Sequence, residues 1–180
     1  LGDVYKRQKK RPGNRDTVIV LTSDHGWNLG EKTHWCKAAI WRDTTRVPFI
    51  VVSPGVSKAG LRNNQPISHV DIYPSLVDLA GITPQNKGLE GTSFKILLQR
   101  PRTLWKKAAF SRYGPAISAV TPKFNYVQYK SGEKMLFDLI SDPDENIDIA
   151  GDPKRKSTLN HHTKILRNGW TDALPPSVQK

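Results

Sequence analysis

Two short and nearly continuous apolar runs stand out in the first third of the chain. Residues 16–22 read DTVIVLT, and residues 49–52 read FIVV. Runs of this length that are rich in β-branched residues are typical of strands buried on both faces, as in a parallel sheet. The sequence therefore predicts two buried strands, and the turn residues Ser53-Pro54-Gly55 end the second one.

Helical spacing of apolar positions appears in two later segments. Residues 72–80 carry apolar side chains at positions 72, 76, 79 and 80, and Gly81 stands where a helix commonly stops. A second helix is predicted from residues 152–153 to about residue 168, with Gly169 after it. Residues 38–41 are predicted to form a short helical turn.

The part of the chain between residues 108 and 139 has a different pattern. Short runs there are separated by Gly, Pro or Ser-Gly, which favours an antiparallel meander. The predicted strands are residues 108–112, 116–121, 125–130 and 134–139. The residues Asp142 and Glu145 that follow are interpreted as part of a turn. His161 and His162, on the last helix, are expected on a solvated face.

A carboxylate and an imidazole stand next to each other where the first strand ends. Asp24 and His25 belong to the sequence SDHG, and Lys37 follows after a short loop. Ligands bind at the carboxyl ends of strands in open α/β sheets, so the pair is a candidate for holding a divalent cation. A histidine ligand favours zinc or manganese, since calcium prefers oxygen. Alternatively, Asp24 caps the next segment and His25 is a loop histidine.

These residues belong to a longer pattern that resembles a known family. The pattern consists of Ser23-Asp24-His25-Gly26, Leu29-Gly30-Glu31, Trp35 with Lys37, and Thr45-Arg46-Val47-Pro48. It is similar to the second half of sulfatases of the alkaline-phosphatase superfamily, above all to iduronate-2-sulfatase-like and choline-sulfatase-like members. The similarity continues to about residue 153. Because members of this family are much longer than 180 residues, the resemblance implies a C-terminal fragment.

The resemblance also implies a fold and a domain organisation. The fold class is α/β: the C-terminal part of an alkaline-phosphatase-like doubly wound sheet, followed by a small antiparallel sheet and a C-terminal helix. Residues 16–107 correspond to the later part of the catalytic domain, and residues 108–180 to the C-terminal subdomain. Residues 1–15 form a basic lead-in; residues 1–8 do not resemble the family and are interpreted as an artefact outside the fold, and residues 9–15 as a loop ahead of the first strand.

The resemblance assigns roles to individual residues. Asp24 and His25 match metal ligands of sulfatases, which implies calcium, with magnesium or manganese as alternatives. Lys37 matches the lysine that contacts the sulfate group, where an ammonium suits a compact anion. His34 is a candidate for contact with the leaving group of the substrate, although a loop histidine is the simpler interpretation.

The nucleophile of the family is a formylglycine made from Cys or Ser in a Cys/Ser-x-Pro/Ala-x-Arg motif. Cys36, the only cysteine, is followed by KAAI and does not match. No other position in the chain fits the motif, so the resemblance places the formylglycine in a missing N-terminal half. The fragment alone is therefore expected to be inactive.

Net charge does not change this hypothesis. The formal charge is +12, and residues 1–15 contain six basic residues against Asp3 alone. The remaining charge is scattered, and no basic stripe interleaved with aromatic residues indicates nucleic-acid binding. An anionic substrate fits the sign of the charge equally well.

No apolar run is long enough to span a membrane, and residues 1–15 lack the apolar core of a signal peptide. The resemblance implies a periplasmic or extracellular protein. The sequence gives no indication of the oligomeric state.

The sequence thus leads to one main hypothesis and two alternatives. The main hypothesis is metal-assisted hydrolysis of a sulfate ester, with a sulfated carbohydrate as the expected substrate. The first alternative is a phosphonate or phosphodiester hydrolase of the same superfamily. The second is a basic, non-catalytic domain that holds sulfated polysaccharide.

Overall fold

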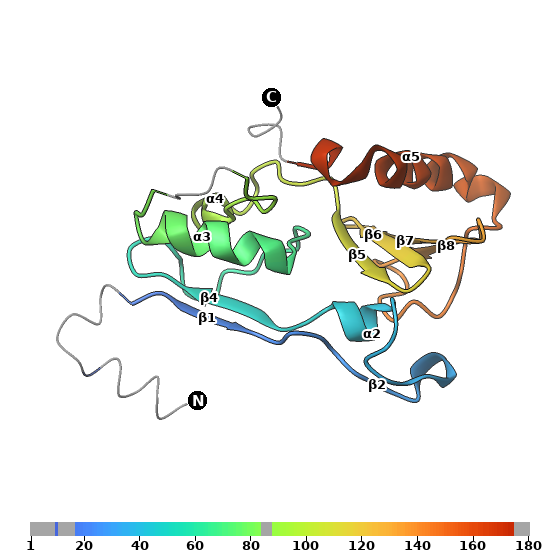
Figure 1. Ribbon diagram of the computed structural model, residues 1–180, viewed down its shortest axis with the longest axis horizontal. Helices are drawn as coiled ribbons and strands as arrows, with labels where there is room; N and C mark the ends of the chain where they lie inside the picture. The colour runs from blue at the N-terminus through green and yellow to red at the C-terminus, as the bar shows by residue number, and fades with distance from the viewer. Residues whose placement is uncertain (1–9, 11–16, 84–87, 175–180) are drawn as a thin grey trace. The chain divides into compact units, whose positions relative to one another are not determined.

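The computed structural model describes residue 10 and residues 17–83 and 88–174. The chain divides into two compact units (Figure 1). Unit 1 comprises residues 1–22, 48–63 and 70–102, and unit 2 comprises residues 23–47, 64–69 and 103–180. Apart from residue 10, the basic lead-in predicted at residues 1–15 lies outside the described residues. The predicted domain boundary at residues 107–108 stays a prediction.

Unit 1 contains the two strands that the apolar runs predict. β1 (Ile19–Thr22) and β4 (Phe49–Val52) pair antiparallel, with Ile19 opposite Val52. The expected burial on both faces is wrong for this pair, because Ile50 is 57% exposed. Side chains alternate along β4, so Phe49 points to the covered face and meets the ring of Phe94 at 5.4 Å. Within the described residues, the opposite face of the pair stays open.

Two helices complete unit 1. α3 (Ile72–Leu79) confirms the predicted helix, and α4 (Lys95–Gln99) follows it. Gly81 has a φ of 67°, the left-handed conformation that ends many helices. The buried Asp71 carboxylate accepts a hydrogen bond from the Thr92 backbone at 2.8 Å, and Lys95 pairs with Asp78 at 2.8 Å. Figure 1 shows α3 beside the β1–β4 pair.

Unit 2 is built on the predicted antiparallel meander. Its sheet has the order β5-β6-β7-β8 with every neighbouring pair antiparallel. The strands are β5 (Ala109–Tyr113), β6 (Ala116–Val120), β7 (Phe124–Tyr129) and β8 (Lys134–Asp138). Ala119 on β6, Tyr126 and Val127 on β7 and Leu136 on β8 are fully buried. The core of unit 2 therefore sits at the middle of this sheet.

The C-terminal helix packs on this sheet. α5 (Lys156–Asp172) follows the 3-10 turn η4 (Pro153–Arg155), and Gly169, at a φ of 79°, interrupts its helical geometry. Ile165 packs against Ala108 and Ala119 of the sheet region. The structure confirms this helix within a few residues of the predicted ends.

The expected solvated face is wrong for one of the two histidines on α5. His162 is only 3% exposed, whereas His161 is exposed. Nδ1 of His162 lies 2.8 Å from the Thr158 carbonyl and Nε2 lies 3.3 Å from Thr121 Oγ1. The sequence around α5 could not reveal this burial, because Thr121 comes from the sheet.

Residues 23–47 carry the short elements of the candidate site. They comprise β2 (Asn28–Leu29), the 3-10 turn η2 (Glu31–Thr33), β3 (Trp35–Cys36) and α2 (Arg42–Thr45). β2 and β3 form an antiparallel hairpin with Leu29 opposite Trp35. The helical turn predicted at residues 38–41 lies instead at α2. Both threonine hydroxyls of α2 donate to the Trp41 carbonyl.

None of the helices within the described ranges is both long and apolar enough to cross a membrane.

Candidate functional site

Asp24 and His25 adopt a geometry that suits a shared cation. Nδ1 of His25 lies 2.8 Å from the Gly26 carbonyl, and because a carbonyl only accepts, Nδ1 carries the proton there. Nε2 of His25 then faces Oδ2 of Asp24 at 3.2 Å. Two ligands of one cation lie roughly 3 Å apart when each bond is about 2.3 Å. Nε2 and Oδ2 therefore suit a bound cation.

The electrostatics of Asp24 agree with this arrangement. Its side chain is 82% exposed, and desolvation, which raises its pKa, is outweighed by the charge of His25, by backbone hydrogen bonds and by the charge of Lys37. The net result is an Asp24 pKa below its ordinary value. The carboxylate is therefore ionised at neutral pH, as metal binding requires.

The backbone next to these two side chains is hydrogen-bonded to α2. The Gly26 and Trp27 N–H groups donate to the carbonyls of Thr44 and Asp43, at 2.8 and 3.0 Å. A Cβ on Gly26 would lie 1.9 Å from the Asp43 carbonyl oxygen, so only glycine fits this approach. The SDHG turn therefore requires its glycine.

Lys37 follows the hairpin on the same loop. Its side chain is exposed, and its charge acts on the Asp24 carboxylate. Three non-glycine residues between β2 and Lys37 have left-handed backbone conformations: Lys32, Thr33 and Cys36. Such conformations are strained and cluster at functional sites. The structure thus places the Lys37 ammonium group in the same segment and charge environment as Asp24 and His25.

His34 and Cys36 take different positions in the hairpin. The Nε2 atom of His34 is buried and has no hydrogen-bond partner within the described part of the chain. Such a polar atom can be satisfied by a ligand. Cys36 is a free, half-buried thiol in the short strand β3.

The metal site is not complete within the described ranges. No group of three or more His, Cys, Asp or Glu residues converges there. Asp24 and His25 would supply one oxygen and one nitrogen, a donor set that fits several divalent cations. A cation held there would orient and polarise a sulfate or phosphate group.

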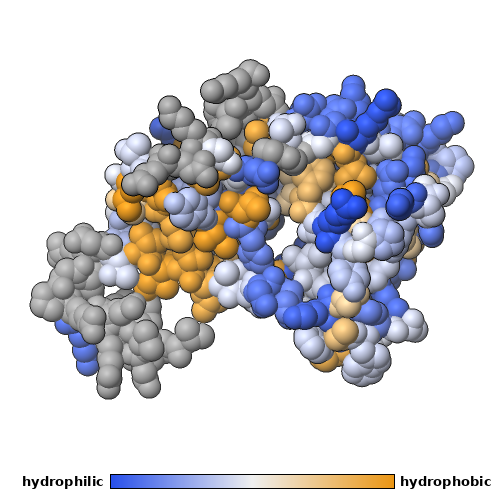
Figure 2. Space-filling view, in the orientation of Figure 1, coloured by the Kyte–Doolittle hydropathy of each residue, from blue (hydrophilic) through white to orange (hydrophobic). Residues whose placement is uncertain are grey.

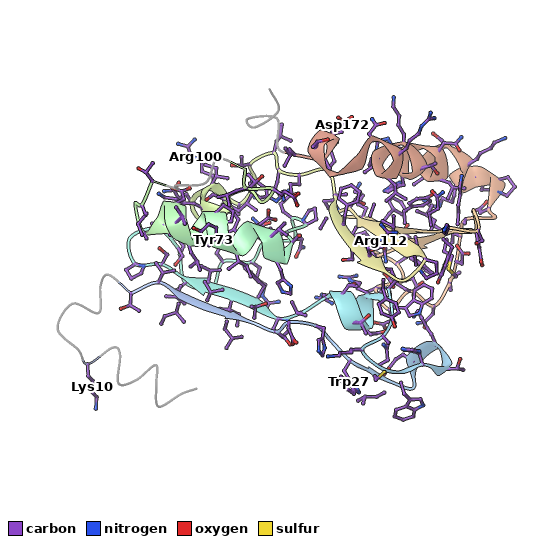
Figure 3. All side chains as sticks on the ribbon, viewed as in Figure 1. Lys10, Trp27, Tyr73, Arg100, Arg112 and Asp172 are labelled. Carbon is purple, nitrogen blue, oxygen red and sulfur yellow. The ribbon has the colours of Figure 1, made fainter. Side chains whose placement is uncertain are left out.

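Sequence reasoning missed two features of this region. Glu145, interpreted as a turn residue, is only 2% exposed and contacts α2 from a position 103 residues away along the chain. Trp27 and Trp35 are large exposed side chains of the hairpin region, 53% and 66% exposed, and Figure 3 shows Trp27 beside the hairpin. The hydrophobic pattern alone does not tell an exposed tryptophan from a buried one.

Comparisons with known proteins agree with this fold. The sequence model of the family described as Sulfatase matches residues 1–82. A sulfatase of Formosa agariphila is 34% identical over 92% of this chain and 32% of its own length. The choline-sulfatase of Rhizobium meliloti is 34% identical over 77% of this chain and 28% of its own length. The chain thus spans about a third of the length of the curated relatives it matches.

Solved structures agree at the level of the fold. A protein solved in complex with its substrate D-glucosamine-2-N,6-O-disulfate has a TM-score of 0.80 and 25% identity, over 97% of this chain and 38% of that one. The phosphonate monoester hydrolase of Agrobacterium radiobacter has a TM-score of 0.79 at 24% identity, over 98% of this chain and 39% of that one, and shares the fold. The chain therefore contains part of an alkaline-phosphatase-like α/β fold. Within that class, it belongs to the sulfatase family.

Proposed function

We propose that this chain is part of a sulfuric ester hydrolase and contributes the Asp24–His25 metal ligands and the sulfate-binding Lys37. The observation that carries the proposal is the 3.2 Å approach of Nε2 and Oδ2, with Nδ1 already committed to the Gly26 carbonyl. Calcium is the cation that the family resemblance favours, with magnesium and manganese as alternatives. A periplasmic or extracellular location is proposed on the same ground.

The roles of the chain's own residues follow from their chemistry. Asp24 and His25 would hold the cation, and the bond from His25 to the Gly26 carbonyl fixes the orientation of the ring. The Lys37 ammonium would stabilise negative charge on the sulfate oxygens. The half-buried ring of His34 would lie on the leaving-group side of the substrate. The 180 residues contain no formylglycine motif, so we derive no nucleophilic step from them.

The exposed tryptophans support a sulfated carbohydrate as the substrate. Trp27 directly precedes the hairpin and Trp35 lies in its second strand, between the candidate metal ligands and Lys37 along the chain. Indole rings provide large, rigid apolar faces with a polar N–H edge, which suit the C–H faces and hydroxyl groups of a sugar ring. The relative solved with its glucosamine disulfate substrate has the same fold.

The test uses the protein expressed from the complete coding locus. We expect it to release 4-nitrophenol from 4-nitrophenyl sulfate and to lose this activity on chelation. Asp24→Ala and Lys37→Ala should each lower kcat/KM by at least about 100-fold, since each removes a metal or charge contact. Lys130→Ala, which removes an exposed lysine of unit 2, is the matched control and should have little effect.

Two other results would replace the proposal. Faster turnover of an aryl phosphonate than of the sulfate would assign the chain to the phosphonate hydrolases, whose fold it shares. Heparin binding that survives Asp24→Ala, Lys37→Ala and chelation, without turnover, would indicate a basic binding domain, as the net charge of +12 permits.

A further inference from the structure

The carboxylate of Glu145 is buried in the turn that follows β8. It is 2% exposed, and its Oε1 accepts a hydrogen bond from Asn125 Nδ2 at 2.7 Å. The backbone φ of Glu145 is 57°, a conformation that glycine and asparagine adopt far more readily. A simple surface turn requires neither a buried carboxylate nor this backbone strain. The burial and the strained backbone together indicate that the Glu145 side chain is kept in the interior of unit 2 by the hydrogen bonds that its carboxylate accepts.

The second oxygen of Glu145 holds the beginning of α2. Oε2 accepts a hydrogen bond from the backbone N–H of Arg42, the first residue of the helix, at 3.0 Å. This N–H has no partner within the helix, and the N-cap residue Trp41 makes no side-chain capping bond. Glu145 therefore caps α2 from a distant part of the chain.

Two more hydrogen bonds join the same turn to the site region. Arg42 Nη1 donates to the Pro143 carbonyl at 3.3 Å, and Lys32 Nζ donates to the Asp144 carbonyl at 2.7 Å. Burial raises the pKa of Glu145, and the hydrogen bonds from Asn125 and Arg42 oppose this rise. The turn after β8 thus contacts both the hairpin and α2.

From α2 the contacts lead directly to the candidate metal ligands. The carbonyls of Asp43 and Thr44 accept hydrogen bonds from Trp27 and Gly26, and the Gly26 carbonyl in turn holds the ring of His25. Glu145 and His25 are thus connected through hydrogen bonds to backbone groups and through the backbone of α2 itself. A shift of α2 would therefore move the SDHG turn.

We propose that Glu145 is a positioning residue, which caps α2 and thereby fixes the turn that carries Asp24 and His25. Its relevance to catalysis rests on the proposed function, whereas the mechanical coupling does not. The simpler alternative is that Glu145 only shapes its own turn. The turn is already stabilised by Asp142, because its carboxylate accepts hydrogen bonds from the backbone N–H groups of Asn146 and Ile147 within the turn.

Amide hydrogen exchange of this chain tests the coupling without metal or substrate. We expect Glu145→Ala to lower the protection of the Gly26 and Trp27 amides by at least about tenfold, while the amide of Val127 in β7 keeps its protection. Asp142→Ala is the matched control from the same turn and should leave Gly26 and Trp27 protected. Glu145→Gln should restore their protection, because its amide oxygen still accepts from Arg42. A flip of the Asn125 amide brings Oδ1, which has no partner among the described residues, into position to accept from the Gln amino group.

A second pair of variants leaves Glu145 in place and serves if Glu145→Ala does not fold. Arg42→Pro removes the N–H that Glu145 accepts, and proline is tolerated at the first position of a helix after an extended residue such as Trp41. Arg42→Ala keeps that N–H. We expect loss of Gly26 and Trp27 protection in Arg42→Pro only.

Unchanged protection in Arg42→Pro, or an equal loss in Arg42→Ala or Asp142→Ala, would overturn the proposal. Neither result depends on whether the complete protein hydrolyses sulfate esters, so failure of the coupling and failure of the proposed function can be told apart.

Discussion

At the scale of single residues, His162 links the stability of unit 2 to pH. Its ring is buried between α5 and the sheet, where it contacts the rings of Phe124 and Tyr126. Burial lowers the pKa of His162; the hydrogen bond to the Thr158 carbonyl opposes this shift, and the neighbouring His161 adds to it. The folded chain therefore favours the neutral imidazole, in which Nδ1 donates to Thr158, and Nε2 lies 3.3 Å from Thr121 Oγ1, which also donates to the Phe124 carbonyl at 3.0 Å.

This arrangement predicts a loss of stability as the pH falls. Above the unfolded-state pKa of about 6.5 the histidine is neutral in both states, and its contribution is fully present. Below that value the unfolded chain binds a proton that the folded chain excludes, so the free energy of unfolding should fall by up to about 1.4 kcal/mol per pH unit. Urea unfolding between pH 8 and pH 5, followed by circular dichroism, measures this slope.

Two substitutions identify the group responsible. His162→Gln should lower the stability at pH 8 and flatten the slope below pH 6.5, whereas His161→Gln, at the exposed neighbour, should leave the slope in place. A slope that persists in His162→Gln would show that another group titrates there. The carboxyl groups of Asp24 and Asp78 have lowered pKa values, so their protonation falls in a more acidic range.

At the scale of elements, the sequence predicts what is determined by neighbouring residues. The four strands of unit 2 and α3 are confirmed, because periodicity and turn residues are local signals, whereas the roles of Asp24 and His25 stay predictions. α2 was misplaced by a few residues, and the burial of His162 and Glu145 was missed. Each of these depends on a partner far along the chain: Glu145 for Arg42, and Thr121 for His162.

The start of the C-terminal helix depends on a contact between residues that are neighbours in the sequence. The Asp152 carboxylate accepts a hydrogen bond from the Lys154 N–H at 2.9 Å, and Pro153 occupies the first turn. Asp152→Ala should lower the free energy of unfolding by about 0.5–2 kcal/mol, because a backbone donor loses its partner. Asp152→Ser keeps a capping oxygen and should recover most of this loss, as measured by urea unfolding. An equal loss in both variants would contradict the capping role.

At the scale of the whole molecule, apolar surface distinguishes unit 1. Figure 2 shows apolar residues gathered over the region of α3 and β4. The large exposed apolar side chains of unit 1 include Ile50, Val52, Val70, Tyr73 and Leu76. Ile50 and Val52 lie on the open face of β4, and a protein that functions in water rarely leaves an extensive apolar surface without a cover. Since the matched relatives are about three times as long as this chain, further chain is a suitable cover for the open face of β4.

This interpretation predicts that substitutions on the open face of β4 change the free energy of unfolding differently in this chain and in the protein from the complete coding locus. Ile50→Thr combined with Val52→Thr keeps β-branched side chains and removes apolar surface. In this chain the double substitution should change the free energy of unfolding by less than about 1 kcal/mol, because the side chains are already exposed. In the protein from the complete coding locus it should cost several kcal/mol, at roughly 1.5–3 kcal/mol for each buried side chain. Urea unfolding of both proteins measures the two values.

Ile140→Thr, in an exposed turn of unit 2 and 71% exposed in this chain, is the control for a general effect of removing apolar side chains. A small effect of the β4 substitutions in both proteins would show that the open face stays uncovered, and a surface for a separate partner would then be the better interpretation. A large effect only in the longer protein would show that β1 and β4 are inner strands of a wider sheet layer. That result would also recover the burial on both faces that the two apolar runs predict from the sequence.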